Sequence, residues 1–582
     1  MSDLIYNTLF RINYTNKTVE EFDASMPISS KALDAQILTF NEVISPVFTA
    51  KTNNEITSIE IEYILDDRFL NSDTLYFNND GNTNDICSVE RIGDKKHVNV
   101  KSVTMLKNEK MNVCLGFGQV TAHRFYSWIY IDNNKVGIHY ELEDKPLVIG
   151  EKYELEKFFL DFCKSDVFFK KYANTIARIN NARPLKEIPI GFCSWSRYYG
   201  KVSQNNIENA AEGLYKYVPE KADLVQIDDG WQSGNSFAGE WTPNTEKFPD
   251  LRALSDSVHE KGMKFGLWVA PLLLSKKSPY YNDLKDLALD DETLGATCPF
   301  NLGDPRFLEH LKNTFKRLTQ EYNVDYYKLD FLSASIRHFV PGASSESVRF
   351  DGDYSVALLR RALGTIREAV GDNVILLACG APILECVGIF DAQRTSCDII
   401  WGKNPNFPPM WDILLGASNS ILHKYFYNNT VFRNDPDGLV VRDYDVGDGF
   451  TCTLDEARFW ATTIAMSGGL VLHNEELDAI DPRRRELFLK LTDPIGVAGR
   501  PIDYFEIGHT TRAVIDYSKN KKYVALYNPD NTEKDLTLNL CDIEMQGASV
   551  TDYWTDEHLG ILNQITVKNA SPHSAYMFVL TK

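Results

Sequence analysis

The sequence lacks several features that would place it in a specialised class of protein. No window approaches the roughly 18 uninterrupted apolar residues that a membrane-spanning helix needs. The first 22 residues, MSDLIYNTLFRINYTNKTVEEF, have neither the basic start nor the small-residue cleavage site of a secretion signal. The ten cysteines include no CxxC pair, which favours reduced thiols over a disulfide framework. We therefore expect a cytoplasmic protein that does not enter a membrane.

Basic residues are in the minority. The 582 residues include 61 Lys and Arg against 81 Asp and Glu, a formal net charge of −20, which argues against nucleic acid and anionic membranes as main partners. The composition is otherwise ordinary, and its 43% of hydrophobic residues is enough for a large core. A chain of this length exceeds the size at which one core stops growing, so we expect several domains.

Both ends of the chain have the pattern of antiparallel sheets. Residues 1–180 contain short alternating stretches such as SIEIEYIL, FYSWIYID and KVGIHYELE, separated by turns rich in Asn, Asp and Gly. This alternation predicts a β-sandwich. A helical run, EKFFLDFCKSDVFFKKYANTIARINNARP, follows it. Strand-like stretches such as KKYVALYNP and SAYMFVLTK return near the end, so residues 491–582 are expected to form a small antiparallel β-domain.

The middle of the chain, residues 181–490, alternates apolar strand-like runs with amphipathic helical stretches. The candidate strands are IPIGFCSW, ADLVQIDD, KFGLWVAP, DYYKLDF, VILLACG, FDAQRTSCD, YFYNNTVFRND and GGLVLHN. Helical spacing of apolar residues occurs between them in NNIENAAEGLYKYV, LRALSDSVHEKG, RFLEHLKNTFKRLTQEY and YSVALLRRALGTIREAVG. Eight such units over roughly 300 residues predict a (β/α)8 TIM barrel, whose active face lies at the C-terminal ends of its strands.

Strand alternation predicts which side chains face the mouth of this barrel. In VDYYKLD, Lys328 and Asp330 share one face of the strand, and we expect the Lys328 charge to lower the pKa of Asp330 and keep it ionised. The same alternation turns Trp195 and Trp268 inward, where indoles could pack against a sugar ring. Taken alone, the charged pair could equally be a structural ion pair, and the tryptophans could be core residues.

Further carboxylates follow two other strands. Asp228 and Asp229 end the second strand in LVQIDDGWQ, although Asp-Asp-Gly is also ordinary turn chemistry. Arg394 and Asp398 lie near the end of the sixth strand in DAQRTSCDI. Several carboxylates with one Lys and one Arg, and no metal-ligand spacing such as HExxH, indicate glycoside chemistry. In that chemistry one carboxylate attacks or stabilises an oxocarbenium-like centre and another donates a proton.

Six strings in one order resemble glycoside hydrolase family 36, the α-galactosidase-type enzymes related to the family 27 melibiases. They are GFCSWSRYYG, QIDDGWQ, FGLWVAP, YYKLDF, ACGAP and RTSCDI. The resemblance runs through about residues 186–475 and includes RNDPDGL and SGGL. It implies an N-terminal β-supersandwich domain over 1–180, a catalytic barrel over 181–490 and a C-terminal β-domain over 491–582.

The resemblance also implies catalytic roles. The family's KxD motif falls on Lys328 and Asp330, which makes Asp330 the expected nucleophile and Lys328 a sugar contact. Its RxxxD motif falls on Arg394 and Asp398, which makes Asp398 the expected acid/base and Arg394 a substrate contact. The family retains anomeric configuration by double displacement, with two carboxyl groups about 5 to 5.5 Å apart. It uses no metal and no organic cofactor.

Binding roles follow from the same resemblance. The paired aspartates that hold the 4- and 6-hydroxyls of galactose match Asp228 and Asp229, and Trp195, Trp268 and Cys379 match further pocket positions. One departure concerns the N-terminal domain, where family members often carry an NGWQSW-like stretch that reaches the active-site mouth. The nearest candidate here, YFNNDGNTNDIC, lacks both tryptophans.

The preferred interpretation is a retaining exo-glycosidase that removes terminal α-galactosyl units from small oligosaccharides. An α-N-acetylgalactosaminidase is an open alternative, because small changes near the 2-position of the sugar can admit an acetamido group. The motif that contains Cys379 is where we expect such a change. A raffinose-synthase-like galactosyl transferase, an aldolase with a Lys328 Schiff base and a non-catalytic sugar-binding protein are further alternatives. Asp435 and Asp437 of NDPDG are expected to order a loop without a catalytic role. The oligomeric state is not indicated.

Overall fold

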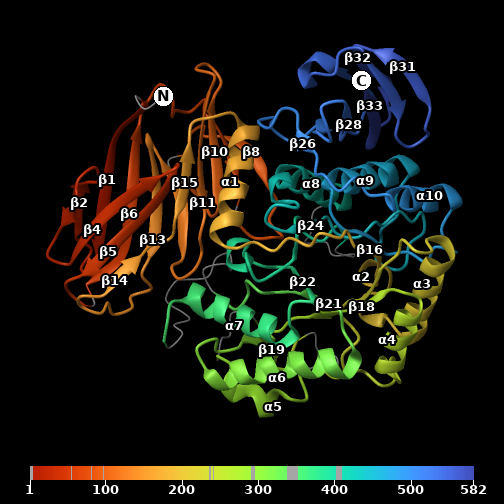
Figure 1. Cartoon of the computed structure of the whole chain (residues 1–582), viewed down its shortest axis with the longest axis horizontal. Coiled ribbons are helices and arrows are strands. Elements are labelled where there is room, and N and C mark those ends of the chain that lie inside the picture. Colours follow the sequence, from red (N-terminus) through yellow and green to blue (C-terminus); the bar gives the residue numbers. More distant parts are fainter. Residues whose placement is uncertain are drawn as a thin grey trace.

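The computed structural model covers most of the chain. The described residues are 4–53, 55–79, 81–95, 97–234, 238–239, 241–289, 295–336, 352–400 and 409–582. Three groups of sheets follow one another along the chain: antiparallel sheets at the left of Figure 1, a parallel sheet at the lower right and antiparallel sheets at the upper right. The predicted fold class is confirmed, whereas the boundaries of the three domains stay a prediction.

The N-terminal region consists of two antiparallel sheets that share an apolar core. One sheet has the strand order β2-β1-β6-β13-β12-β9, and the other has the order β3-β4-β5-β15-β11-β10-β7-β8, with β14 beside β5. The predicted alternation is clear in β6, where Ile59 and Ile61 are fully buried and Glu60 between them is partly exposed. The strands are β1 (Ile5–Tyr14), β2 (Val19–Asp23), β3 (Ile28–Ser29), β4 (Leu33–Phe40), β5 (Val43–Ala50), β6 (Ile56–Leu65), β7 (Leu75–Asn78), β8 (Ser88–Arg91), β9 (His97–Val100), β10 (Val103–Asn108), β11 (Val113–Gln119), β12 (Ser127–Asp132), β13 (Lys135–Glu141), β14 (Lys152–Glu154) and β15 (Phe158–Asp161).

The helix that follows the sandwich is shorter than the sequence predicted. The first residues of the predicted run form strand β15, and helix α1 covers only Ser165–Ile179. The physical reason is pairing, because Phe158 and its neighbours complete the second sheet between β5 and β11. Helix α1 then packs on β11, where a side chain at Gly116 would lie 2.1 Å from the Phe168 ring.

Eight parallel strands form the central barrel, and their spatial order follows the chain. The sheet order is β24-β23-β22-β21-β18-β17-β16-β25. The Leu470 backbone N–H donates to the Asn434 carbonyl at 2.9 Å, which brings the two ends of the sheet together. The strands are β16 (Ile190–Cys193), β17 (Leu224–Ile227), β18 (Lys264–Val269), β21 (Tyr326–Leu329), β22 (Ile375–Ala378), β23 (Ala392–Arg394), β24 (Arg433–Asp435) and β25 (Val471–His473). A short hairpin, β19 (Leu273–Ser275) and β20 (Thr297–Pro299), follows β18.

Side-chain alternation divides the barrel into an inner and an outer core. The inner cluster includes Leu224, Tyr326 and Leu377. The next residues along those strands, such as Val225 and Tyr327, belong to the larger core outside the barrel. Lys328 shares the inward face with Tyr326, as the sequence predicted.

Helices cover the outside of the barrel, and the four predicted ones are confirmed. They are α3 (Gln204–Tyr217), α4 (Leu251–Glu260), α6 (Pro305–Tyr322) and α7 (Ser355–Val370), and the barrel also has α2 (Trp195–Tyr198), α5 (Tyr281–Leu284), α8 (Met410–His423), α9 (Leu454–Ser467) and α10 (Pro482–Leu491). The predicted seventh strand is mostly wrong. Tyr425–Tyr427 forms a 3-10 turn and Asn429 has a φ of 55°, so the chain turns before β24 begins.

The C-terminal strands form a six-stranded sheet and a two-stranded one around an apolar core that includes Val524, Leu526 and Phe578. The strands are β26 (Arg500–Pro501), β27 (Arg512–Ile515), β28 (Lys521–Asn528), β29 (Lys534–Asn539), β30 (Ala548–Asp552), β31 (His558–Leu562), β32 (Gln564–Ala570) and β33 (Ser574–Thr581).

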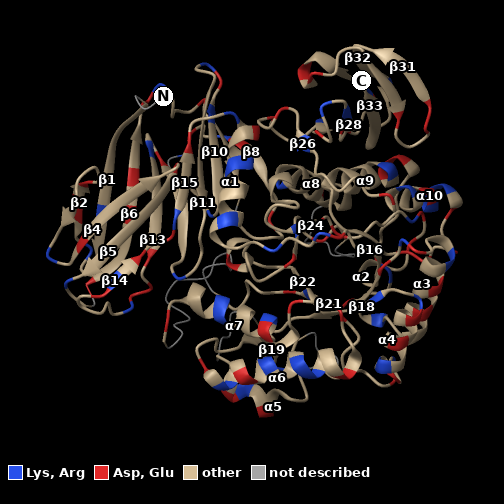
Figure 2. Cartoon of the chain, in the orientation of Figure 1, with Lys and Arg blue, Asp and Glu red and all other residues tan. Residues whose placement is uncertain are grey.

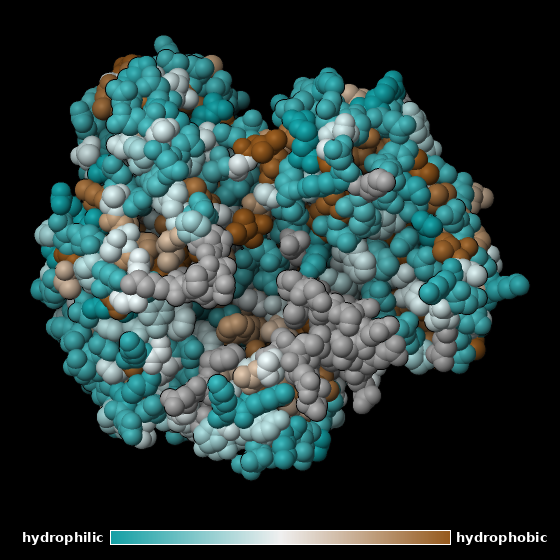
Figure 3. Space-filling model, turned by 180° about the vertical axis from the view of Figure 1, so that it is seen from behind, coloured by the Kyte–Doolittle hydropathy of each residue, from teal (hydrophilic) through white to brown (hydrophobic). Residues whose placement is uncertain are grey.

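The molecular surface is mixed in charge and mostly hydrophilic. Acidic and basic residues are interspersed along the barrel helices α4 and α6 (Figure 2). Seen from behind, a notch with exposed hydrophobic atoms separates the two upper lobes (Figure 3). Within the described residues, no helix is both long and apolar enough to cross a membrane.

The close approach of β16 and β17 requires a glycine at position 191. A Cβ on Gly191 would lie 1.8 Å from the Leu224 carbonyl oxygen, so we expect Gly191→Ala to destabilise the protein by about 1–3 kcal/mol or more through overpacking. The readout is the midpoint of thermal unfolding. Gly364→Ala is the matched control, because a Cβ at that position of α7 meets nothing within 4 Å and alanine favours a helix. Equal midpoints for the two variants would contradict the expected clash.

Candidate active site

A buried ion pair links two strands beneath the barrel mouth. The Lys328 Nζ donates to Asp228 Oδ2 at 2.9 Å, and both side chains are less than a tenth exposed. Burial is the largest single effect and lowers the pKa of Lys328, but the charges of Asp228, Cys379 and Cys193 together outweigh it and raise this pKa well above its ordinary value. The direct partner of Lys328 is therefore Asp228, the last residue of QID in the second strand region, and not Asp330.

Short hydrogen bonds fix the Asp228 carboxylate. Gln226 Nε2 donates to Oδ2 at 2.7 Å, and the Asp229 backbone N–H donates to Oδ1 at 2.9 Å. The Asp228 backbone N–H itself donates to Ser194 Oγ at 2.9 Å. Gln226 lies in β17, whereas Asp229 and Ser194 follow β17 and β16, so local sequence and strand pairing together orient this carboxylate.

Asp229 lies beside the pair but is more accessible. Its Oδ1 accepts a hydrogen bond from Gln232 Nε2 at 2.6 Å, and the residue is half-buried. Burial, with a smaller contribution from the Asp228 charge, raises the pKa of Asp229 to about 6. Near neutral pH this carboxylate is ionised and can accept further hydrogen bonds from a ligand.

Asp330 follows β21 directly, and both of its oxygens are held. Trp268 Nε1 donates to Oδ2 at 3.1 Å, and the Phe331 backbone N–H donates to Oδ1 at 2.7 Å. Burial raises the pKa of Asp330, whereas the Lys328 charge opposes that rise. The Lys328 charge thus lowers the pKa of Asp330 as predicted, but burial outweighs it and the pKa is raised overall.

The backbone around Asp330 adopts conformations that constrain its neighbours. Phe331 has a φ of 55° and Gly380 a φ of 52°. A Cβ on Gly380 would lie 2.8 Å from Asp330 Oδ1, so only glycine allows the turn after β22 to pack against this carboxylate. The glycine of ACGAP therefore shapes the site, a role that the sequence alone does not reveal.

Arg394 is surrounded by three carboxylates. Its Nη2 lies 3.0 Å from Asp398 Oδ1 and 2.9 Å from Asp437 Oδ2, and its Nε lies 3.8 Å from Asp435 Oδ2. Burial raises the pKa of Asp435 to about 6. Asp435 and Asp437 thus belong to the site's charge network, which the sequence analysis did not anticipate. A carboxylate pair directly after a barrel strand was the available signal.

Asp398 is the accessible carboxylate of this group. Its side chain is 27% exposed, whereas that of Arg394 is 1% exposed. The Asp398 charge also contributes to the raised pKa of Asp330, after the larger effects of burial and of Lys328. Asp330 directly follows β21 and Asp398 lies four residues after the end of β23, so both follow strands of the barrel. Their catalytic roles stay a prediction.

The predicted aromatic and thiol residues occupy different parts of this region. Trp268 is buried, and its indole edge contacts Asp330. Trp195 is half-buried, packs against the inner barrel cluster and meets Tyr199 edge to face at 5.2 Å between ring centroids. Cys379 is fully buried, with Sγ 3.8 Å from Arg394 Nη1. The structure gathers all nine predicted site residues around the C-terminal ends of the barrel strands.

A loop of the N-terminal sandwich also reaches this region. Residues 81–87, between β7 and β8, lie within the YFNNDGNTNDIC stretch. The Gly380 backbone N–H donates to Asn84 Oδ1 at 3.2 Å, and the Thr83 backbone N–H donates to the Ala381 carbonyl at 2.8 Å. The loop approaches the barrel mouth even though it lacks the tryptophans of the family stretch.

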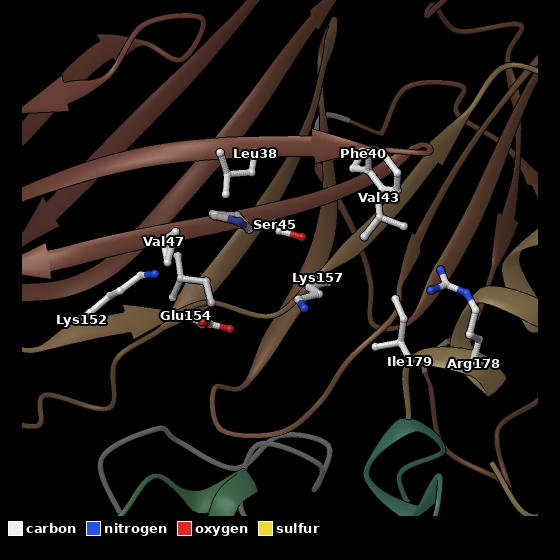
Figure 4. Close-up of a pocket in the computed structure, with 12 residues that line it drawn as sticks. Leu38, Phe40, Val43, Ser45, Val47, Lys152, Glu154, Lys157, Arg178 and Ile179 are labelled. Carbon is white, nitrogen blue, oxygen red and sulfur yellow. The ribbon is translucent and has the colours of Figure 1, made fainter. Parts of the chain in front are cut away.

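A separate cavity on the N-terminal sandwich does not fit this chemistry. It has a volume of about 430 Å³ and lies between β4, β5, β14 and the end of α1 (Figure 4). Glu154 is its single carboxylate, beside Lys152, Lys157 and Arg178, and the rest of the lining is mainly apolar. One carboxylate cannot supply the two that glycoside cleavage needs. In the described parts of the chain, no group of three or more His, Cys, Asp or Glu side chains is arranged to hold a metal ion.

Comparison with known proteins gives matches over part or most of the chain. Residues 164–350 match the family model described as Melibiase. An α-galactosidase of Oryza sativa is 22% identical over 426 residues, which cover 67% of this chain and 84% of that protein. The bifunctional α-galactosidase/sucrose kinase AgaSK of Mediterraneibacter gnavus is 28% identical over 165 residues. That match covers 26% of this chain, and the chain spans only 17% of AgaSK.

Solved structures show the same fold. The family 36 α-galactosidase AgaA of Geobacillus stearothermophilus superposes with a TM-score of 0.67 at 14% identity, covering 98% of this chain and 89% of AgaA. The α-galactosidase TtGalA of Thermus thermophilus, in complex with p-nitrophenyl α-D-galactopyranoside, gives a TM-score of 0.61 at 18% identity, covering 88% of this chain and 98% of TtGalA. The chain is therefore similar to the Melibiase family over residues 164–350, and its fold is that of α-galactosidases such as AgaA and TtGalA.

Proposed function

We propose that the protein is a retaining exo-glycosidase that hydrolyses terminal α-galactosidic bonds of small oligosaccharides. One observation carries the proposal: Asp330, Asp398, Asp228 and Asp229 come from the ends of three different strands and meet at one barrel mouth. Two interacting carboxyl groups beside a further pair of hydrogen-bond acceptors fit double displacement on a sugar. The α-galactoside bound to the Thermus thermophilus relative supports the choice of sugar.

In this proposal Asp330 is the nucleophile. Its carboxylate is held by the Trp268 indole and the Phe331 backbone N–H, so it is oriented before the substrate arrives. One oxygen attacks the anomeric carbon as the bond to the leaving oxygen breaks, which forms a glycosyl ester. The nearby Lys328 charge favours the ionised carboxylate against the effect of burial.

Asp398 acts as acid and then as base. In the first step its carboxyl proton passes to the leaving oxygen, and in the second step it takes a proton from the water that hydrolyses the ester. Its partial exposure gives it access to both the leaving group and water. Arg394, Asp435 and Asp437 would position it, while Asp228, Asp229, Trp195 and Cys379 would contact the sugar.

The proposed activity can be tested with paired chromogenic substrates. The purified protein should release nitrophenol from a nitrophenyl α-galactoside, and Asp330→Ala should abolish the release because the nucleophile is lost. Unchanged circular dichroism of the variant would show that the fold is intact. Preference for the α-N-acetylgalactosaminide would contradict the proposed galactose specificity but would agree with the proposed double displacement. Cleavage of neither substrate, or mainly transfer to a sugar acceptor, would contradict the proposed hydrolase.

The role of Asp398 predicts a dependence on the leaving group. Asp398→Ala should lower kcat/KM for an oligosaccharide by about 10²–10⁴-fold, the usual contribution of general acid catalysis. The loss should be much smaller for a dinitrophenyl galactoside, whose leaving group needs no proton. Equal losses for both substrates would assign Asp398 to binding rather than to proton transfer.

The raised pKa of Asp229 predicts a pH dependence. If its ionised carboxylate accepts hydrogen bonds from sugar hydroxyls, kcat/KM should fall as the pH drops through about 6, since the protonated form accepts poorly. Asp229→Asn should have lower activity throughout and should lose this titration. The range to measure is pH 5 to 7, about one unit on either side of the pKa of Asp229. A wild-type profile that is flat over this range, or an unchanged titration in the variant, would speak against this role.

A further inference from the structure

The loop formed by residues 81–87 of the N-terminal sandwich is held against the barrel by several hydrogen bonds. It runs beside the segment that follows β22: the Ile383 backbone N–H donates to the Gly81 carbonyl at 2.9 Å, and the Ala381 N–H donates to Thr83 Oγ1 at 3.0 Å. Asn82 Nδ2 donates to Ser333 Oγ at 3.0 Å, just beyond Asp330 in the chain. The loop thus touches the segments that follow both β21 and β22.

A buried lysine holds the other side of this loop. Lys424, directly after α8, is fully buried. Its Nζ donates to the carbonyl oxygens of Asn82, Thr83 and Asp85, each at 3.1 Å. All three ammonium protons are therefore used on one loop, and an ammonium group is seldom buried unless it is satisfied in this way. Lys424 links the N-terminal sandwich to the barrel at the active face.

The side chain that this arrangement positions is Asn84. Its Oδ1 accepts from the Gly380 backbone N–H at 3.2 Å and faces Cys379 Sγ at 3.9 Å. Gly380 in turn packs directly on Asp330 Oδ1. In the part of the chain that the structure describes, Asn84 Oδ1 is engaged and Nδ2 has no hydrogen-bond partner. The Asn84 side chain is only half-buried. A free N–H donor therefore belongs to a side chain that is separated from the proposed nucleophile Asp330 only by Gly380.

We propose that Asn84 determines substrate specificity by donating a hydrogen bond to the 2-hydroxyl of the sugar. The inference rests on the proposed function. Asp330 bonds to the anomeric carbon in double displacement, so a donor fixed beside Asp330 meets the substituent on the next carbon, and hydrogen bonds to the 2-hydroxyl strengthen in the transition state. Lys424 is a positioning residue that holds the loop, and the fixed loop disfavours the larger acetamido group.

The first test compares a nitrophenyl α-galactoside with its 2-deoxy analogue. Asn84→Ala should lower kcat/KM for the galactoside by about tenfold or more, the usual effect of one lost hydrogen bond. It should leave kcat/KM for the 2-deoxy substrate nearly unchanged. Ile86→Ala is the matched control, because it shortens an exposed apolar side chain of the same loop and leaves the hydrogen bond between Asn84 and Gly380 in place. Its ratio between the two substrates should stay at the wild-type value.

The second test concerns Lys424. Lys424→Met should reproduce the changed substrate ratio of Asn84→Ala, and the double variant should change it no further, because both substitutions remove one interaction. Lys424→Arg, which keeps the charge and donors, is the variant to use if the methionine substitution prevents folding, and it should retain the wild-type ratio. Independent, additive effects of Lys424→Met and Asn84→Ala would overturn the positioning role.

The outcomes separate this inference from the proposed function. Suppose that the wild-type protein cleaves the α-galactoside, and that Asn84→Ala lowers kcat/KM equally for both substrates or for neither. This result overturns the role of Asn84 and agrees with the proposed function. A wild-type protein that cleaves no α-galactoside and shows no galactose binding by calorimetry overturns both.

Discussion

The active face depends on the buried ion pair between Lys328 and Asp228. A buried pair has a large desolvation cost and persists only where geometry and further hydrogen bonds compensate for it. Here Gln226 and the Asp229 backbone complete the bonding of the carboxylate. The pair joins β17 to β21 across β18, the strand between them in the sheet. The pair therefore holds these two strand ends in place beneath the more accessible carboxylates of the barrel mouth.

The remaining carboxylates differ in their surroundings, and these differences fit the distinct roles proposed for them. Asp330 is held by an indole and a backbone N–H, whereas Asp398 lies on a guanidinium that also meets Asp435 and Asp437. Environments that distinguish two carboxyl groups are how one site supplies both a nucleophile and an acid. The N-terminal sandwich also borders the site, since the loop of residues 81–87 packs against Gly380. Barrel and sandwich are thus in direct contact beside the proposed site.

Much of this could be predicted because strands impose alternation and barrels place their functional residues at strand ends. The inward positions of Lys328 and Trp195 follow from those rules. The sign of the pKa shift of Asp330 could not be predicted from those rules, because its burial depends on how distant segments pack around it. Contacts such as that of Lys424 with the loop of residues 81–87 join residues more than 300 positions apart, and no local pattern predicts such a pairing.

Asp330 is proposed to form a covalent bond to the sugar, and the other proposed roles depend on this bond. Its most direct test is to incubate the protein with an α-galactosyl fluoride that carries a second ring fluorine, which slows hydrolysis of the intermediate, and to map the product by peptide mass spectrometry. We expect one added sugar residue on the peptide that contains Asp330. A label on another carboxylate, or hydrolysis of α-galactosides with inverted configuration and no labelled peptide, would contradict it.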